Sequence, residues 1–132
     1  MNLVIDASAA VSLVLGIPVS ENFYAPLDQA ELVMSPDLFV AEVSNAIWKY
    51  RKAGLLPLDR CETALEQALS LPDQLEASFG LHREAFVLAV RHLHSVYEAL
   101  HLVLARRNNA AILTLDRRLA ELARKLEIDV IG

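Results

Sequence analysis

Short apolar runs alternate with amphipathic segments along this chain of 132 residues. Apolar runs bounded by turn residues predict buried strands, whereas apolar positions that recur every three or four residues predict helices. The expected strands are residues 2–5, 32–34, 111–115 and 128–131, with a short edge strand at 74–77. The expected helices are residues 7–15, 20–29, 36–52, 57–71, 81–92, 95–107 and 116–126.

Two of these helices carry start signals in the sequence. Ser20 is a candidate N-cap for the helix at 20–29, because its hydroxyl can accept a hydrogen bond from the first turn. Ser35, Pro36 and Asp37 supply an N-cap, a proline at the first helical position and an acid in the first turn. They therefore predict a helix that starts there and stops at Gly54.

The alternation of strands and helices predicts an α/β fold. Parallel strands need crossover connections, so we expect a short central parallel sheet with helices on both faces. The length suits one domain with a substantial core. The prediction is a single Rossmann-like, three-layer domain that spans residues 1–132.

Two aspartates follow buried strands and precede helices. Asp6 comes after Leu3-Val4-Ile5, and Asp116 comes after the run that ends at Leu115. Each has an ordinary explanation as the N-cap of the next helix. However, groups just past the carboxyl ends of parallel strands line the crevice where α/β proteins bind ligands. The two carboxylates are therefore expected to meet there, with Ser8 and Thr114 placed to orient them by hydrogen bonds.

Two glutamates have unusually apolar neighbours. Glu42 lies at the edge of the buried face of its helix, and Asn45, one turn on, can donate an amide hydrogen bond to a carboxylate. Glu98 is the single acid in a nearly apolar helix, so it must be paired, neutral or bound to a metal. His101, one turn along, is its expected partner. Glu-x-x-His also occurs in di-iron bundles, but a second such pair is missing here.

Four clustered acids without a cysteine cluster indicate a hard cation, Mg²⁺ or Mn²⁺. Such a site suits phosphoryl transfer or phosphodiester hydrolysis. The formal net charge of −5 argues against a nucleic-acid partner unless bound cations reverse the local field. An aspartyl phosphatase with Asp6 as nucleophile would want an acid two residues on, where this chain has Ser8.

The composition indicates the compartment and the surface character of the protein. Cys61 is the only cysteine, which excludes an intrachain disulfide and favours the reducing cytoplasm. We expect no signal peptide and no membrane span, because Asp6 interrupts the apolar start and no apolar stretch is long enough. The apolar fraction of 55% is high and suggests a surface covered by a second copy or another partner.

In four places, and in the right order, the sequence resembles the PIN-domain nucleases, most closely the VapC-type toxins. The matching motifs are Val4-Ile5-Asp6-Ala7-Ser8, Ser35-Pro36-Asp37-Leu38 with Glu42 and Asn45-Ala46, Val96-Tyr97-Glu98-Ala99, and Leu113-Thr114-Leu115-Asp116-Arg117-Arg118. Two positions depart from the family. Glu98 stands where an aspartate is usual, and His101 stands where a tyrosine is usual.

The resemblance implies a cytoplasmic, Mg²⁺-dependent endoribonuclease that leaves a 5′-phosphate and a 3′-hydroxyl. Asp6 and Asp116 would be the principal metal ligands, with Glu42 and Glu98 completing the catalytic site. It also implies a homodimer and a cognate antitoxin whose tail enters the cleft. The alternative is a PIN-fold module that binds RNA or protein and whose nuclease site is weakened by the glutamate at position 98.

Overall fold

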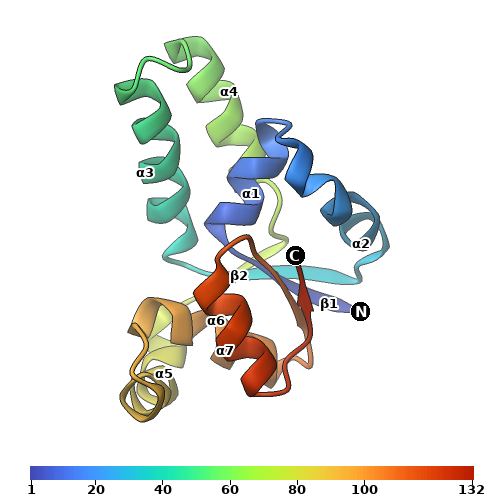
Figure 1. The fold of residues 1–132 in the computed structure, drawn as a ribbon, viewed down its shortest axis with the longest axis vertical. Coiled ribbons are helices and arrows are strands. Elements are labelled where there is room, and N and C mark those ends of the chain that lie inside the picture. Colours follow the sequence, from blue (N-terminus) through green and yellow to red (C-terminus); the bar gives the residue numbers. More distant parts are fainter.

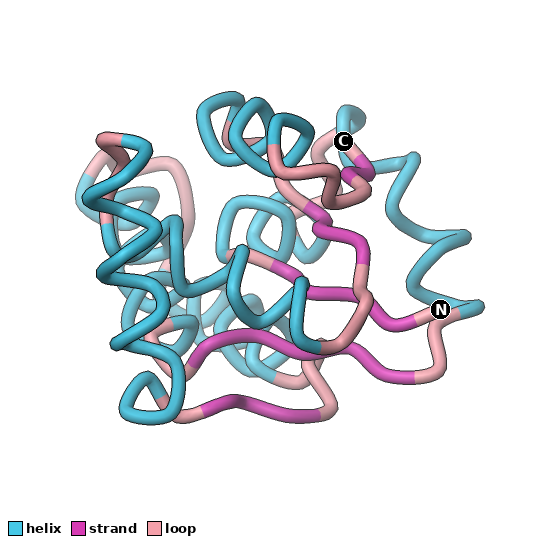
Figure 2. The backbone as a smooth tube through the Cα atoms, turned by 90° about the horizontal axis from the view of Figure 1, so that it is seen from below, coloured by secondary structure: helices cyan, strands magenta, loops and turns pink.

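Five parallel strands form one sheet in the computed structural model, which describes residues 1–132. The strands are β1 (Asn2–Ile5), β2 (Leu32–Pro36), β3 (Gln74–Glu76), β4 (Ala111–Leu113) and β5 (Val130–Ile131). Their order is β3-β2-β1-β4-β5, and Figure 2 shows them side by side. The chain thus runs outwards from β1 to β3 and then returns to the other side of β1. The strand order switches between β1 and β4, where α/β sheets bind their ligands.

Seven α-helices and one 3₁₀ helix cover the sheet on both faces. They are α1 (Ala7–Val14), η1 (Pro18–Phe23), α2 (Tyr24–Gln29), α3 (Phe39–Lys52), α4 (Leu58–Leu69), α5 (Ser78–His92), α6 (Val96–Arg107) and α7 (Arg117–Lys125). Figure 1 shows α1, α3 and α4 above the strands and α5, α6 and α7 below them. The expected α/β class, with a parallel sheet between two helical layers, is confirmed.

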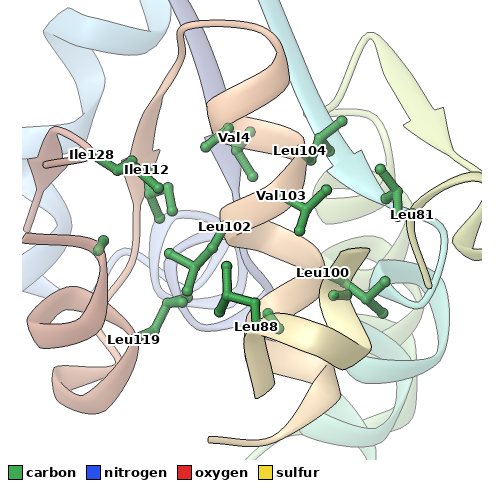
Figure 3. Packing of buried hydrophobic residues seen from close by; sticks show 14 of the residues in the cluster. Val4, Leu81, Leu88, Leu100, Leu102, Val103, Leu104, Ile112, Leu119 and Ile128 are labelled. Carbon is green, nitrogen blue, oxygen red and sulfur yellow. The ribbon is translucent and has the colours of Figure 1, made fainter. Parts of the chain in front are cut away.

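Alternation along the strands divides the interior into two cores. Leu3 and Ile5 of β1 pack with α1, α3 and α4, whereas Val4 between them packs with α5, α6 and α7. In β4, Ile112 faces the same side as Val4. Figure 3 shows both side chains against those of α6. Each fully buried Leu, Ile or Val of this kind contributes roughly 1.5–3 kcal/mol to folding.

Helix α6 is the central element of the second core. Its seven consecutive residues from 99 to 105 are all buried, so the helix is surrounded on every side. Two of its charged or titratable residues, Glu98 and His101, lie in or next to this buried stretch. Their side chains must therefore find partners inside the protein or in a cavity. No helix of the chain is both long and apolar enough to cross a bilayer.

The predicted helix start at residues 35–37 is wrong. Ser35 and Pro36 belong to strand β2, where Ser35 Oγ donates a hydrogen bond of 2.7 Å to the carbonyl of Ile5. Asp37 accepts hydrogen bonds from the backbone N–H and the hydroxyl of Ser78. It thereby secures the start of α5, which begins three residues earlier than predicted. Helix α3 itself begins at Phe39.

Smaller differences concern the predicted helix 20–29 and the late strands. The 20–29 segment is a 3₁₀ helix followed by the short α2, and Ser20 is not an N-cap. Its buried hydroxyl donates to the carbonyl of Ile17 at 2.7 Å. Strand β4 ends at Leu113, so Thr114 lies in the loop beyond the sheet. The edge strand β3 is confirmed, and β5 is shorter than predicted.

Candidate active site

Asp6 lies at the switch point, between the end of β1 and the start of α1. Its backbone N–H donates to the carbonyl of Leu113 at 3.2 Å, which continues the pairing of β1 with β4. One carboxylate oxygen accepts hydrogen bonds from Ala9 N at 2.9 Å and Ser8 Oγ at 2.7 Å. The other accepts one from Thr114 Oγ1. Asp6 is therefore the N-cap of α1, is only 6% exposed and is held in a single orientation.

Thr114 joins the two aspartates. Its hydroxyl donates to Asp6 and accepts a hydrogen bond of 2.9 Å from the backbone N–H of Asp116. Ser8 Oγ adds a bond from the backbone N–H of Leu115, also at 2.9 Å. These contacts tie the loop after β4 to the start of α1. Ser8 and Thr114 lie where the sequence predicts orienting groups, beside Asp6.

Asp116 caps α7 in the same way that Asp6 caps α1. One of its carboxylate oxygens accepts hydrogen bonds from Arg118 N at 2.9 Å and Leu119 N at 3.2 Å. Unlike Asp6, Asp116 is exposed to solvent, and its second oxygen accepts no hydrogen bond from the protein. The capping explanation thus holds for both aspartates, and both nevertheless face one cavity.

Glu42 reaches the same place from the first turn of α3. It is half-buried, and this burial raises the pKa of its carboxyl above the usual value of 4.5. The negative charges of Asp6 and Asp116 raise the pKa further, whereas His101 opposes them. The hydrogen bond expected from Asn45 is not formed. That side chain is exposed and lies outside the cavity.

Glu98 is paired with His94, not with His101 as expected. His94 precedes Glu98 by four residues, and its Nδ1 lies 2.7 Å from Glu98 Oε2. The link is possible because Leu93 ends α5 in the left-handed conformation, with φ of 55°. The chain then turns, and Ser95 caps α6 by accepting from Glu98 N at 3.2 Å. The spacing of His94 and Glu98 is the sequence signal that points to this pair.

One cavity of about 290 Å³ collects these groups. It is lined by the four predicted acids together with small, polar and aromatic neighbours: Asp6, Ala7, Ser8, Glu42, Ser95, Tyr97, Glu98, His101, Asp116 and Leu119. The acids come from four segments spread over 111 positions of the chain, between residues 6 and 116. Sequence reasoning placed all four acids and Ser8 near this crevice, but it missed Ser95 and the part played by His94.

The donor set fits a divalent cation in chemistry and charge. Carboxylate oxygens are the ligands that hard cations prefer, and mutual repulsion among them contributes to the raised pKa of Glu42. A cation beside them would relieve that repulsion. In the present side-chain conformations, however, no three His, Cys, Asp or Glu groups are grouped closely enough to hold an ion. Binding therefore requires rotation of one or more acidic side chains. Asp116 keeps one oxygen free of hydrogen bonds, whereas both oxygens of Asp6 accept hydrogen bonds.

Comparison with known proteins identifies the family. Residues 3–125 match the PIN domain family. The chain is 37% identical over 123 residues to the protein named Ribonuclease VapC3 from Pyrobaculum aerophilum. The alignment covers 92% of this chain and 94% of that protein. The four acids all fall inside the matched region.

Two solved structures share the fold. PAE2754 from Pyrobaculum aerophilum gives a TM-score of 0.72 at 23% identity, covering 92% of this chain and 86% of that one. VapBC2 from Rickettsia felis, solved with a DNA fragment from its promoter, gives a TM-score of 0.68 at 14% identity. The match covers 99% of this chain and 98% of that one. At these identities the likeness concerns the fold alone. With the family match and the VapC3 relative, it leads to one conclusion: this chain belongs to the PIN domain family.

Proposed function

We propose that this chain is a divalent-metal-dependent endoribonuclease and the toxin of a toxin–antitoxin pair. The observation that carries the proposal is the convergence of Asp6, Glu42, Glu98 and Asp116 on one cavity at the switch point of the sheet. The 37% identity to Ribonuclease VapC3 supports RNA as the substrate. We take residues 1–132 to act as one nuclease unit in the cytoplasm, where RNA is abundant.

Asp6 and Asp116 would be the principal ligands of Mg²⁺, or of Mn²⁺, with Glu42 and Glu98 completing the set. Such an ion polarises a scissile phosphate and lowers the pKa of water beside it. The protein residues supply the geometry. Ser8 and Thr114 fix the Asp6 carboxylate, and His94 holds Glu98 at the cavity wall. A bound cation would also reverse the local negative field, which otherwise repels RNA from a chain of net charge −5.

The direct test is incubation of the purified protein with total RNA, with Mg²⁺ or Mn²⁺ and with a chelator, followed by mapping of the RNA ends. We expect metal-dependent cuts with 5′-phosphate and 3′-hydroxyl ends. Asp6→Asn and Asp116→Asn should fold and lose cleavage. The matched control is Asp59→Asn, which removes an exposed acid outside the cavity and should cleave normally. Normal cleavage by both cavity variants would refute the assignment.

The glutamate at position 98 provides a second test. Aspartate is usual there in the family, so Glu98→Asp should keep or raise the cleavage rate, whereas Glu98→Ala should lower it. Equal rates in all three proteins would show that Glu98 plays no part. If the wild-type protein binds RNA but never cleaves it, the alternative of a weakened binding module replaces the nuclease.

Two protein partners complete the proposal. The VapC resemblance implies an antitoxin that inhibits the nuclease, and co-expression of this chain with its gene neighbour tests that partnership. A second copy of the chain is the proposed occupant of an apolar stripe on α5, defined by Phe79, Phe86, Val90 and Leu93. These side chains are 60–88% exposed. These four side chains are uncharged and can pack against their own copies across a two-fold axis, with the exposed Arg83 beside them on the same face of α5.

A further inference from the structure

His101 is a buried titratable side chain for which neither the fold nor the four acids account. It lies on α6 three positions after Glu98, so the two side chains share a face of the helix. The residue is only 3% exposed, yet it lines the cavity that holds the acids. An imidazole in such a place either packs as a core residue with satisfied nitrogens or presents a nitrogen to something in the cavity.

The hydrogen bonding of the ring decides between these two cases. Nδ1 lies 2.8 Å from the backbone carbonyl of Tyr97. A carbonyl can only accept, so Nδ1 carries the proton and, in the neutral ring, Nε2 carries the lone pair. Nε2 is buried and has no hydrogen-bond partner. A buried acceptor without a partner is energetically costly, so a ligand bound at Nε2 would stabilise it.

The position of the ring relative to the acids indicates what fills it. Nδ1 bonds the backbone of its own helix, so Nε2 is the ring nitrogen that is left without a partner, in a residue that lines the cavity. The ring is close enough to Glu42 to affect the pKa of its carboxyl. No hydrogen bond joins His101 to any acid, so the lone pair is not already used.

We propose that His101 Nε2 is a nitrogen ligand of the divalent ion held by the four acids of the cavity, and that the site therefore prefers Mn²⁺ to Mg²⁺. The proposal rests on the proposed metal-dependent function. Histidines that bind metals through one nitrogen commonly donate the other N–H to a backbone carbonyl, which fixes the tautomer and the ring orientation. The bond from His101 to Tyr97 has this form.

The preference for Mn²⁺ follows from ligand chemistry. Mg²⁺ demands oxygen ligands in near-ideal octahedral geometry and retains several of its waters. First-row transition ions bind imidazole better, and for a given nitrogen-containing site their affinity rises from Mn²⁺ onwards along the series. A donor set of carboxylates plus one imidazole thus favours Mn²⁺ over Mg²⁺. The two family departures, Glu98 and His101, occur in the same helical turn of α6.

The test uses Mn²⁺ as an electron-spin probe in the chain of 132 residues, without RNA. Pulsed EPR detects the coupling of a ligating nitrogen to Mn²⁺, and labelling histidine with ¹⁵N identifies it as imidazole. We expect a histidine coupling in the wild-type protein and its loss in His101→Gln. Glutamine is close in size and its amide can still donate to the Tyr97 carbonyl. Mn²⁺ affinity should fall at least about tenfold, since loss of even an outer-shell partner costs 10–100-fold.

Two histidine variants serve as controls. His82 is exposed and bonds a backbone carbonyl in the same way, with Nδ1 2.7 Å from Phe79 O. His82→Gln should keep both coupling and affinity. His94→Gln removes the partner of Glu98 and should also keep the coupling. A coupling lost in His94→Gln but retained in His101→Gln would assign the nitrogen to His94 and overturn the proposal.

The remaining outcomes separate this inference from the proposed function. Mn²⁺ binding without any histidine coupling would show that His101 is not a ligand and would overturn this inference, whereas the nuclease proposal would survive. Tighter binding of Mg²⁺ than of Mn²⁺ would overturn the stated preference. If His101→Gln fails to fold, His82→Gln, His92→Gln and His94→Gln in the isotope-labelled protein still identify the ligand by elimination, because the chain has four histidines. Absence of RNA cleavage with an intact His101 coupling would reject the nuclease alone.

Discussion

Thr114→Val is the substitution that best tests how the fold holds the acids in place. The Thr114 side chain is 1% exposed, and its hydroxyl links the Asp6 carboxylate to the backbone N–H of Asp116. Valine has nearly the same shape but can neither donate nor accept. The change therefore removes both hydrogen bonds while leaving the space filled.

The cost follows from the two hydrogen bonds that valine cannot make. A hydrogen bond to a charged group contributes about 1.5–3 kcal/mol, and an orphaned N–H costs about 1 kcal/mol more. The added methyl group returns about 0.8 kcal/mol through burial. The net loss is about 2–3 kcal/mol of unfolding free energy. With an unfolding entropy of about 0.28 kcal/mol/K for 132 residues, Tm should fall by about 7–11 °C.

Thermal unfolding by circular dichroism measures this shift, and calorimetric titration with Mn²⁺ measures the effect on the site. Metal affinity should fall, because Asp6 and Asp116 lose their common tether. Thr63→Val is the matched control. Its hydroxyl is exposed and bonds only the carbonyl of Asp59, so Tm should move by less than about 2 °C. Equal Tm values for Thr114→Val and Thr63→Val would refute the role assigned to the Thr114 network.

Three further predictions address charge, packing and assembly. Glu42→Gln should raise Tm of the metal-free protein at pH 7–8, because a carboxyl whose pKa is raised by burial destabilises the fold when ionised. The same variant should abolish cleavage, because it removes a proposed metal ligand. The gain in Tm should shrink as pH falls through the raised pKa and vanish below the usual value of 4.5; a gain that persists there would contradict the cause given. Leu102→Ala, at a fully buried position of α6, should cost about 2–5 kcal/mol in denaturant unfolding, whereas Leu55→Ala, at a side chain 67% exposed, should cost almost nothing. Phe86→Glu should convert the proposed dimer into a monomer on size-exclusion chromatography, and the exposed Leu58→Glu on α4 should not; unchanged elution of both would exclude the α5 stripe as the contact.

Much of the fold could be predicted because the strands are short apolar runs that end abruptly at polar residues. The predicted positions of β1 and β4 gave the two aspartates a common crevice. The segment at 35–37 could not be assigned correctly from local sequence. Its N-cap, proline and acid fit a helix start, but Ser35 bonds Ile5 and Asp37 bonds Ser78, 41 positions away. Such tertiary contacts override local propensity and leave no trace in a window of ten residues.

The candidate site could likewise be predicted only in part. The acids could be predicted because they are charged residues among apolar neighbours. Burial of such a charge is costly unless the charge is paired or binds a metal. The partner of Glu98 could not be predicted. His94 and His101 both lie at helical spacing from Glu98, and the choice depends on the left-handed turn at Leu93, a conformation that leucine rarely adopts. The sequence therefore predicted the residues of the site better than their hydrogen-bond partners.

The double use of Asp6 and Asp116 has a practical consequence for anyone who wants a harmless form of this protein. Each carboxylate both fastens a helix to the sheet and supplies charge to the cavity. Replacement by alanine at either position would remove both the catalytic carboxylate and the N-cap of a helix. If such a variant then failed to bind the antitoxin, partial unfolding would explain the failure as well as a lost contact would. Asparagine caps helices about as well as aspartate does, so it is the better substitution for an inactive variant that must stay folded.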